Sequence, residues 1–135
     1  MAISFDTDHN PIVGKAEKLE DDLVVITADN ASPMTFTGTR TYILGTENLI
    51  VIDPGPNSEA HLSSIMKYIG KRKVTDILLT HSHIDHSPLS RQLKTETGAR
   101  IIGFGSADEA RTSFMKKLSS SLDLGGEEGI DKDLV

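Results

Sequence analysis

The sequence predicts an α+β domain built of αβ layers, with helices on one side of a mixed sheet. Strand, helix, strand, helix and strand alternate between residues 49 and 103, which favours right-handed βαβ units and a largely parallel part of the sheet. A hairpin-like pair of short strands precedes this part and surrounds a connection that contains Gly45. Because the strands of a hairpin are antiparallel, the two observations together predict a mixed sheet.

Five apolar segments are expected to be strands. Leu23–Thr27 is a continuous apolar run. Arg40–Leu44 and Leu49–Ile52 form the hairpin, and the second of these strands ends at a proline-rich turn because proline has no N–H to donate. Val74–Thr80 contains consecutive aliphatic residues, so both of its faces are expected to be buried. Arg100–Gly103 is expected to be the last strand.

Two helices are expected between the parallel strands. The first has an apolar stripe at spacings i, i+3, i+4 and i+7, formed by Leu62, Ile65, Met66 and Ile69. Asn57 or Ser58 can cap its start, and Gly70 lies where a helix commonly ends. The second helix is expected to begin at Ser87-Pro88, with proline in the first turn, and to end at Gly98.

The composition is that of one globular domain. The chain has 135 residues, of which 37% are hydrophobic and 25% charged. Residues 1–20 are expected to be an N-terminal extension, 107–118 a further helix, and 119–135 a polar, poorly ordered tail. The start has no signal-peptide pattern, and no apolar run approaches the roughly 18 residues of a membrane span, so we expect a cytoplasmic protein that does not bind membranes.

Composition also restricts the chemistry. The chain has no cysteine, which excludes disulfides, a thiolate nucleophile, cysteine-ligated zinc and iron–sulfur clusters. A metal ion must therefore be held by His, Asp or Glu. The net charge of -6 argues against nonspecific binding of nucleic acid.

Three of the five histidines fall in one short segment, Thr80-His81-Ser82-His83-Ile84-Asp85-His86, after a predicted strand. His81 and His83 are two residues apart, so an extended backbone points both imidazoles the same way. Asp85 and His86 lie where the chain turns toward the next helix. Two pairs of ligands could thus serve two neighbouring ions, with zinc favoured and iron or manganese as alternatives. The competing interpretations are an exposed polar loop and a histidine pair without metal, although the segment offers no nucleophile for the latter.

This segment resembles the HxHxDH signature of the metallo-β-lactamase superfamily. Residues 39–45 (TRTYILG) resemble an early hairpin of that family, and residues 49–55 (LIVIDPG) resemble its "IDxG" strand end. Ser87-Pro88-Leu89, followed by Thr97-Gly98-Ala99, resembles a subgroup that includes the LACTB2-like hydrolases. The resemblance covers about residues 22–105 and implies the N-terminal half of an αβ/βα sandwich with a binuclear metal site at one edge.

The resemblance also implies a role for each residue. His81 and His83 would bind the first metal, and Asp85 and His86 the second, with Asp85 also orienting the catalytic water. In the family, a metal-bound hydroxide attacks an ester, thioester, amide or phosphodiester. Asp53 matches a residue that orients a ligand imidazole from behind, although an Asp-Pro-Gly turn is an equally good interpretation of it.

The ligand set is incomplete in this chain. The family supplies a third histidine, a bridging aspartate and a last histidine after the motif, whereas no histidine follows His86 here. We therefore expect the chain alone to be weak or inactive and to hold one weakly bound ion or none. His61 is interpreted as a surface residue of the first helix. Asp6, Asp8, Asn10 and Glu17 have EF-hand spacing, but Pro11 stands where that loop requires glycine, so no calcium site is expected.

Three hypotheses follow for function. The chain is half of a metal-dependent hydrolase, or a partner completes it, or it is a non-catalytic truncated fragment. Half a sandwich should expose an apolar sheet face, through which a second copy or a complementary half-domain could bind. The substrate, a small molecule or single-stranded RNA, stays open: the resemblance favours RNA or a thioester over a β-lactam, and the acidic balance disfavours RNA.

Overall fold

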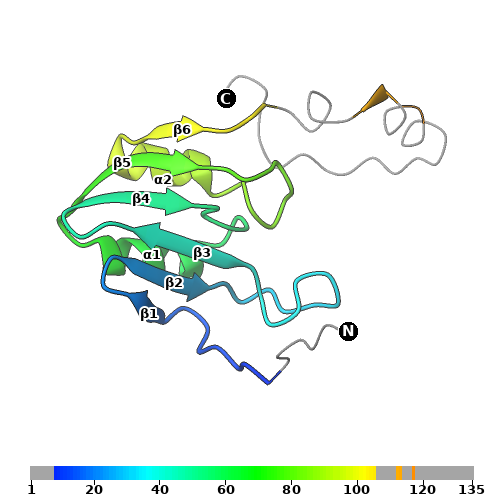
Figure 1. Cartoon of the computed structure of the whole chain (residues 1–135), viewed down its shortest axis with the longest axis horizontal. Coiled ribbons are helices and arrows are strands. Elements are labelled where there is room, and N and C mark those ends of the chain that lie inside the picture. Colours follow the sequence, from blue (N-terminus) through cyan, green and yellow to red (C-terminus); the bar gives the residue numbers. More distant parts are fainter. Residues whose placement is uncertain (1–7, 106–111, 114–116, 118–135) are drawn as a thin grey trace, which may run out of the picture.

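The computed structural model describes residues 8–105, 112, 113 and 117, which form six strands and two helices in the described part of the chain. Figure 1 shows the sheet with both helices behind it. The elements in chain order are β1 (Ala16–Glu20), β2 (Leu23–Thr27), β3 (Arg40–Leu44), β4 (Asn48–Ile52), α1 (Glu59–Ile69), β5 (Lys73–Leu78), α2 (Ser90–Thr97) and β6 (Arg100–Ile102). The expected αβ layering, with helices on one side, is confirmed.

The sheet is mixed, as expected. Its spatial order is β1-β2-β3-β4-β5-β6, the same as the order along the chain. Strands β1 to β4 pair antiparallel, while β4–β5 and β5–β6 pair parallel. The parallel pairs are joined by α1 and α2, so the sheet is antiparallel in its first half and βαβ-like in its second.

The core lies between the sheet and the helices. Apolar side chains from the inner sheet face and both helices form one buried cluster: Val24, Ile26, Ile43, Leu49, Val51, Ile65, Ile69, Val74, Ile77, Leu89, Leu93 and Ala99. Helix α1 begins where expected, with the Ser58 side chain accepting a hydrogen bond from the backbone N–H of His61. Its C-cap, Gly70, donates its N–H to the carbonyl of Met66.

Helix α2 starts later than the sequence predicts. Its first residue is Ser90, and Ser87 belongs instead to the loop before the helix. The Ser87 hydroxyl donates to the backbone carbonyls of Ser82 and His83 at 3.1 Å each. These local hydrogen bonds close the histidine segment into a compact turn. Serine side chains commonly bind nearby backbone carbonyls in this way, which competes with helix formation.

Strand β1 lies within the expected N-terminal extension and was not predicted. It pairs antiparallel with β2, and its residues are half-buried or exposed. An edge strand of this kind carries charged side chains that discourage further pairing, here Glu17, Lys18 and Glu20. It therefore lacks the apolar run by which the other strands could be recognised.

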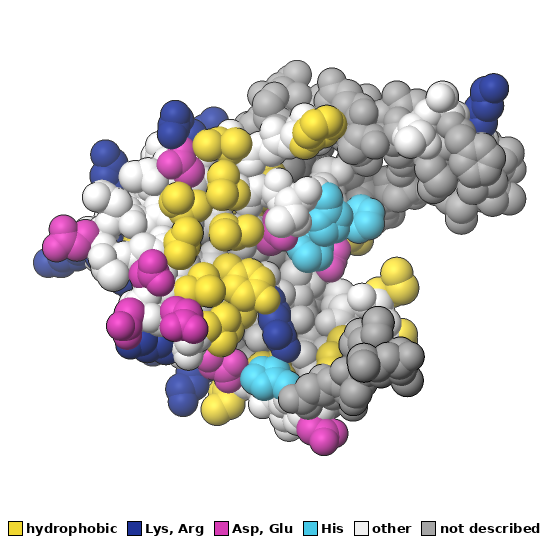
Figure 2. Space-filling view, viewed as in Figure 1, with side chains coloured by type: hydrophobic (Ala, Val, Ile, Leu, Met, Phe, Trp, Pro, Cys, Tyr) yellow, Lys and Arg dark blue, Asp and Glu magenta, His cyan; other side chains and the backbone are white. Residues whose placement is uncertain are grey.

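The outer face of the sheet carries apolar side chains in two rows that cross the strands. One row runs through Val25, Tyr42, Ile52, Leu78 and Ile102, which are register partners in successive strands. The other begins with Leu23, Leu44 and Ile50 and continues into the ion pair of Asp76 and Arg100. Leu44 and Ile102 are 37% and 43% exposed. Figure 2 shows a hydrophobic surface over the strands on this face, and α1 and α2 both lie on the opposite face.

Two expectations fall on the undescribed part of the chain. The helix expected over 107–118 lies almost wholly outside the described residues, and the tail 119–135 lies wholly outside them. Within the described part, neither helix has the length and hydrophobicity that crossing a bilayer would require.

Candidate metal centre

The histidine segment and Asp53 meet at the carboxyl ends of β4 and β5. These strands are parallel neighbours, so the turns that follow them lie at the same edge of the sheet. The two turns are tied together at Gly55, whose N–H donates to the carbonyl of His86 at 2.9 Å. The carbonyl of Gly55 in turn accepts from the N–H of Leu89 at 3.2 Å. The edge of a rigid sheet thus carries both parts of the site.

Asp53 is a buried carboxylate at the centre of this edge, only 6% exposed. Its Oδ1 accepts a hydrogen bond from the backbone N–H of Thr80 at 2.8 Å. Its Oδ2 accepts from the Thr80 hydroxyl at 2.6 Å and from His86 Nδ1 at 3.0 Å. The backbone at Asp53 has φ of 48°, a conformation that costs free energy in a residue other than glycine. Asp53 is therefore both a turn residue and a partner of His86.

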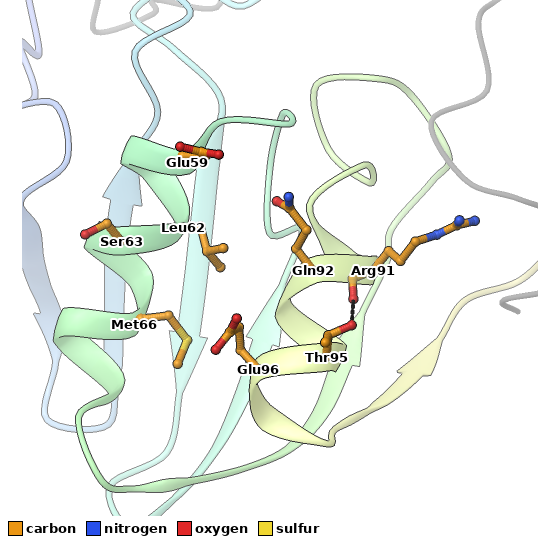
Figure 3. A pocket seen from close by; sticks show the side chains of 8 residues that line it. All are labelled: Glu59, Leu62, Ser63, Met66, Arg91, Gln92, Thr95 and Glu96. Carbon is orange, nitrogen blue, oxygen red and sulfur yellow. Dashed lines mark hydrogen bonds between the residues drawn. The ribbon is translucent and has the colours of Figure 1, made fainter.

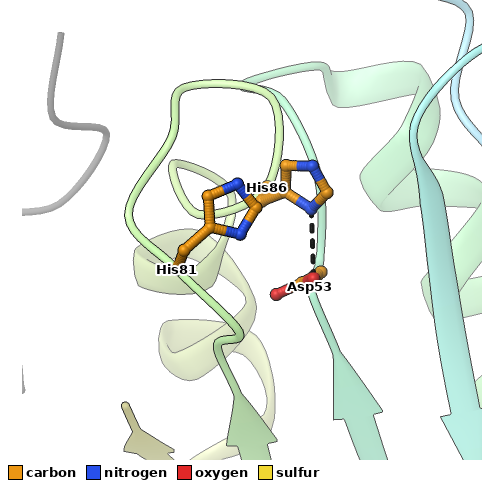
Figure 4. A group of neighbouring side chains, drawn as sticks. All are labelled: Asp53, His81 and His86. Atoms are coloured by element: carbon orange, nitrogen blue, oxygen red, sulfur yellow. Dashed lines mark hydrogen bonds and ion pairs between the residues drawn. The ribbon is translucent and has the colours of Figure 1, made fainter. Parts of the chain in front are cut away.

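The hydrogen bonds around Asp53 fix the tautomers of two histidines. An ionised carboxylate has no proton to give, so His86 donates its Nδ1 proton to Asp53 and keeps a lone pair on Nε2. The proton of the Thr80 hydroxyl is likewise used toward Asp53, so that hydroxyl accepts from His81 Nδ1 at 2.9 Å. His81 therefore also keeps a lone pair on Nε2. Figure 4 shows the two rings side by side above the carboxylate.

The three imidazoles of the motif lie close together. The ring centroid of His81 is 4.5 Å from that of His83 and 4.2 Å from that of His86. Burial lowers the pKa of His81, and the neighbouring His86 and then His83 lower it further, while Asp53 and Asp85 oppose the shift. A lowered pKa keeps the His81 imidazole neutral and available as a ligand.

Asp85 faces the same group. Its Oδ2 lies 3.2 Å from Nε2 of His86, the nitrogen that the Asp53 contact leaves with a lone pair. Two acceptor atoms at this distance repel each other, so the contact needs either a second proton on the His86 ring or a cation between the two atoms. The nitrogen and carboxylate atoms gathered here are of the kind that binds a divalent metal ion.

The candidate group overlaps the predicted ligands without matching them fully. Asp53, His81 and His86 each offer a ligand atom within 4.8 Å of the others. His83 stands beside them through its ring contact with His81, and Asp85 through its contact with His86. Because Asp53 already accepts three hydrogen bonds, its geometry suits orienting the His86 ring better than binding metal directly.

The interpretation of His61 as a surface residue is wrong. The side chain is 3% exposed, and its Nε2 lies 2.8 Å from the Thr41 hydroxyl. Thr41 donates its own proton to the backbone carbonyl of Asp53 at 2.8 Å, so it accepts from His61. Burial lowers the pKa of His61 to about 4. From the sequence, His61 is a polar residue at the edge of the apolar stripe of α1, where exposure is expected. The sequence does not show that the turn after Asp53 covers this edge of the helix.

Two hydroxyl residues that the sequence analysis did not single out hold Asp53 in place. Thr80 binds its carboxylate, and Thr41 binds its backbone carbonyl. Thr80 adjoins the histidine segment and Thr41 lies in the hairpin that resembles the family, so position within the motifs was the available signal. Neither residue type is by itself a sign of a metal site.

A cleft of about 560 Å³ opens beside the histidines. It lies between the β2–β3 connection and the histidine segment, and its lining residues are Asn30, Ser32, Met34, Thr35, His83, Ile84, Asp85 and His86. Met34 and Ile84 are 93% and 49% exposed, so they offer apolar surface to a bound molecule. The site thus combines candidate metal ligands with a partly apolar wall.

A second hollow of about 570 Å³ lies between the two helices. Figure 3 shows Leu62 and Met66 of α1 facing Gln92 and Glu96 of α2 across it. Glu59, Ser63, Arg91 and Thr95 complete its lining. It contains no histidine and is separate from the metal centre.

The fold and the centre define a class: one αβ layer with a group of His and Asp side chains that could hold a metal ion at the carboxyl edge of its sheet. The model of the metallo-β-lactamase superfamily matches residues 34–134, and the chain belongs to that superfamily. Members of the superfamily are hydrolases, and their sites hold metal ions.

Relatives of known name agree with this membership. A β-lactamase-like protein 2 homolog of Drosophila melanogaster is 34% identical over 107 residues, which cover 72% of this chain and 36% of that protein. An atrochrysone carboxyl ACP thioesterase of Aspergillus terreus is 32% identical, over 59% of this chain and 26% of that protein. A β-lactamase domain protein from Burkholderia ambifaria has the same fold, with a TM-score of 0.60 at 19% identity, over 86% of this chain and 36% of that one. The chain thus matches between about a quarter and little more than a third of each relative's length.

Proposed function

We propose that this chain carries the N-terminal half of a metal-dependent hydrolytic site. The observation that carries the proposal is the orientation of His81 and His86, which both spend their Nδ1 protons on the Asp53 network and present Nε2. Zinc suits these nitrogen and carboxylate ligands best, with iron or manganese as alternatives. When bound, such an ion acts as a Lewis acid toward substrate and water.

Each of these residues would have a separate role in the site. His81 and His83 would hold one ion, while Asp85 and His86 would hold a second. Asp53 orients His86 from behind, since its carboxylate is already committed to Thr80 and His86. Asp85 borders the cleft, so its carboxylate would also accept a hydrogen bond from the water that attacks the substrate.

For the substrate we propose an acyl thioester or a related small ester. The cleft beside the histidines has apolar side chains at Met34 and Ile84, which suit an acyl group. A matched relative carries the name ACP thioesterase, which supports the same chemistry. Single-stranded RNA is the alternative, and the absence of Lys and Arg among the cleft residues argues against it because RNA binding relies on phosphate contacts.

The site needs further ligands, which we propose come from a second αβ layer packed on the outer sheet face. A catalytic zinc commonly has three protein ligands, and no histidine follows His86 in these 135 residues. The apolar rows on the outer face give that layer a surface to bury. A complementary half-domain or a second copy would serve. The other reading, a non-catalytic fragment, and the cytoplasmic location stay predictions from the sequence.

The test is metal content and hydrolysis of the 135-residue protein. We expect elemental analysis to find at most one weakly held zinc per chain, removed by dialysis against a chelator. His81→Ala combined with His83→Ala should abolish that binding and any thioester hydrolysis with added zinc. His9→Ala is the matched control, because His9 is an exposed histidine whose ion pair is with Glu17. Binding that survives the double substitution would refute the site, and tight binding of two zinc ions by a monomer would refute its incompleteness.

A further inference from the structure

Thr39 is the residue immediately before β3, at the end of the β2–β3 connection that borders the cleft. Its side chain is 5% exposed. Its backbone carbonyl accepts from the N–H of Ala28 at 2.9 Å, which ties it to the end of β2. The residue is therefore held by the sheet although it borders a loop.

The Thr39 hydroxyl reaches across to Asp85. The distance from Thr39 Oγ1 to Asp85 Oδ2 is 2.9 Å, between residues 46 positions apart in sequence. An ionised carboxylate only accepts, so the hydroxyl donates. This bond joins the β2–β3 connection to the segment that carries the candidate ligands.

Asn30 binds Thr39 through two hydrogen bonds and thereby fixes which atoms of this group donate and which accept. Its Oδ1 accepts from the backbone N–H of Thr39 at 2.8 Å, which fixes the orientation of the amide because that N–H can only donate. Its Nδ2 must then donate to the Thr39 hydroxyl, at 3.0 Å. A hydroxyl that accepts from one side is a better donor on the other, so Asn30 strengthens the bond to Asp85.

We propose that Thr39, supported by Asn30, is a positioning residue that sets the Asp85 carboxylate. The inference rests on the proposed hydrolytic site, in which Asp85 binds a metal ion and orients water. The bond from Thr39 holds Oδ2 of Asp85 where it lies 3.2 Å from Nε2 of His86, and so stops the carboxylate from rotating away from that ligand. Partners that orient metal ligands in this way commonly change metal affinity by about 10- to 100-fold.

The experiment separates the hydroxyl from the shape of the side chain. Thr39→Val keeps the volume and removes the hydrogen bond, whereas Thr39→Ser keeps the hydroxyl. Thr75→Val is the matched control, because Thr75 also donates its hydroxyl, in its case to the backbone carbonyl of Leu49 at 3.3 Å, away from the site. Co²⁺ titration of the 135-residue protein, followed by absorbance, should show about 10-fold weaker binding for Thr39→Val and little change for the other two.

A second measurement reads the carboxylate without metal. NMR couplings of the metal-free protein should show one side-chain rotamer of Asp85 in the wild type and in Thr39→Ser, and averaged rotamers in Thr39→Val. Asn30→Ala, on the loop, should give a weaker form of the same averaging and serves if Thr39→Val does not fold. Unchanged Co²⁺ affinity and an unchanged rotamer in Thr39→Val would overturn the proposal, as would a Thr39→Ser protein that behaves like Thr39→Val. A wild type that binds no Co²⁺ would mean that the ligands of these 135 residues do not hold an ion by themselves, and the rotamer measurement would still decide the role of Thr39.

Discussion

His86 and His61 are both linked to Asp53, the first directly and the second through Thr41, and the two links have opposite chemical results. His86 meets the carboxylate and keeps its other nitrogen toward Asp85 and the cleft. His61 reaches the backbone of the same residue through Thr41 and is 3% exposed. The comparison shows that availability to a ligand depends on which nitrogen is committed and where the other one points. In the proposed site one histidine faces the metal ion, and the other supports the turn.

Of the substitutions that test this comparison, removing the charge at Asp53 should have the largest effect, which is on metal affinity. In Asp53→Asn an amide nitrogen replaces one acceptor, so Thr80 and His86 cannot both keep their present bonds. We expect Co²⁺ affinity to fall about 100-fold, which titration would measure. Asp76→Asn is the control, since Asp76 is paired with Arg100 on the outer face; equal losses in both variants would contradict the role of Asp53.

His61, the buried histidine, should make the free energy of unfolding depend on pH. Its pKa is near 4 when folded and near 6.5 when unfolded, so below pH 6.5 the unfolded chain binds the proton more readily. Stability is therefore lost as the pH falls from 6.5 toward 4. Between pH 7 and 5 we expect His61 to cost about 2 kcal/mol of unfolding free energy.

Urea unfolding of the wild type and His61→Gln at both pH values isolates that contribution. Other groups titrate alike in the two proteins, so the difference between the two pH dependences belongs to His61. Parallel curves would show that His61 titrates normally in the folded state.

The last expected effect concerns the close approach of Gly55 to His61. Gly55 has φ of 98°, and a Cβ there would lie 3.0 Å from Cδ2 and Nε2 of the His61 ring. Gly55→Ala should therefore destabilise by about 1–3 kcal/mol and disturb the N–H bond from Gly55 to His86. At Gly98 φ is also positive, but an added Cβ would have no neighbouring atom within 4 Å. Gly98→Ala should therefore lower the free energy of unfolding by about 1 kcal/mol. Thermal unfolding that ranks the two equally would mean that the close approach to His61 carries no cost.

The sequence predicted the strands whose hydrophobic pattern is local. Leu23–Thr27 and Arg40–Leu44 have the expected bounds, and of the two expected caps of α1, Asn57 and Ser58, the structure has Ser58. It did not predict β1, because an edge strand needs no apolar run. It placed the start of α2 too early, because the hydroxyl of Ser87 binds the preceding turn.

The same distinction between local and long-range contacts applies to the candidate site. His81, His83, Asp85 and His86 are close in sequence, so their spacing alone indicates one centre. Thr39, Thr41 and His61 reach the centre from other elements, through contacts that only the pairing of strands creates. Single-residue chemistry could not identify them, since threonine and a lone histidine are common in any domain.

The order of the strands bears on how this layer comes into being during synthesis. Each strand of the described sheet pairs with the one made just before it, so a growing chain can add β1 to β6 in turn without waiting for a distant partner. Contacts between segments close in sequence form fastest. The layer can therefore be complete while the Tyr, Ile and Leu side chains of its outer rows are still accessible to water, in the interval when newly made chains aggregate most readily.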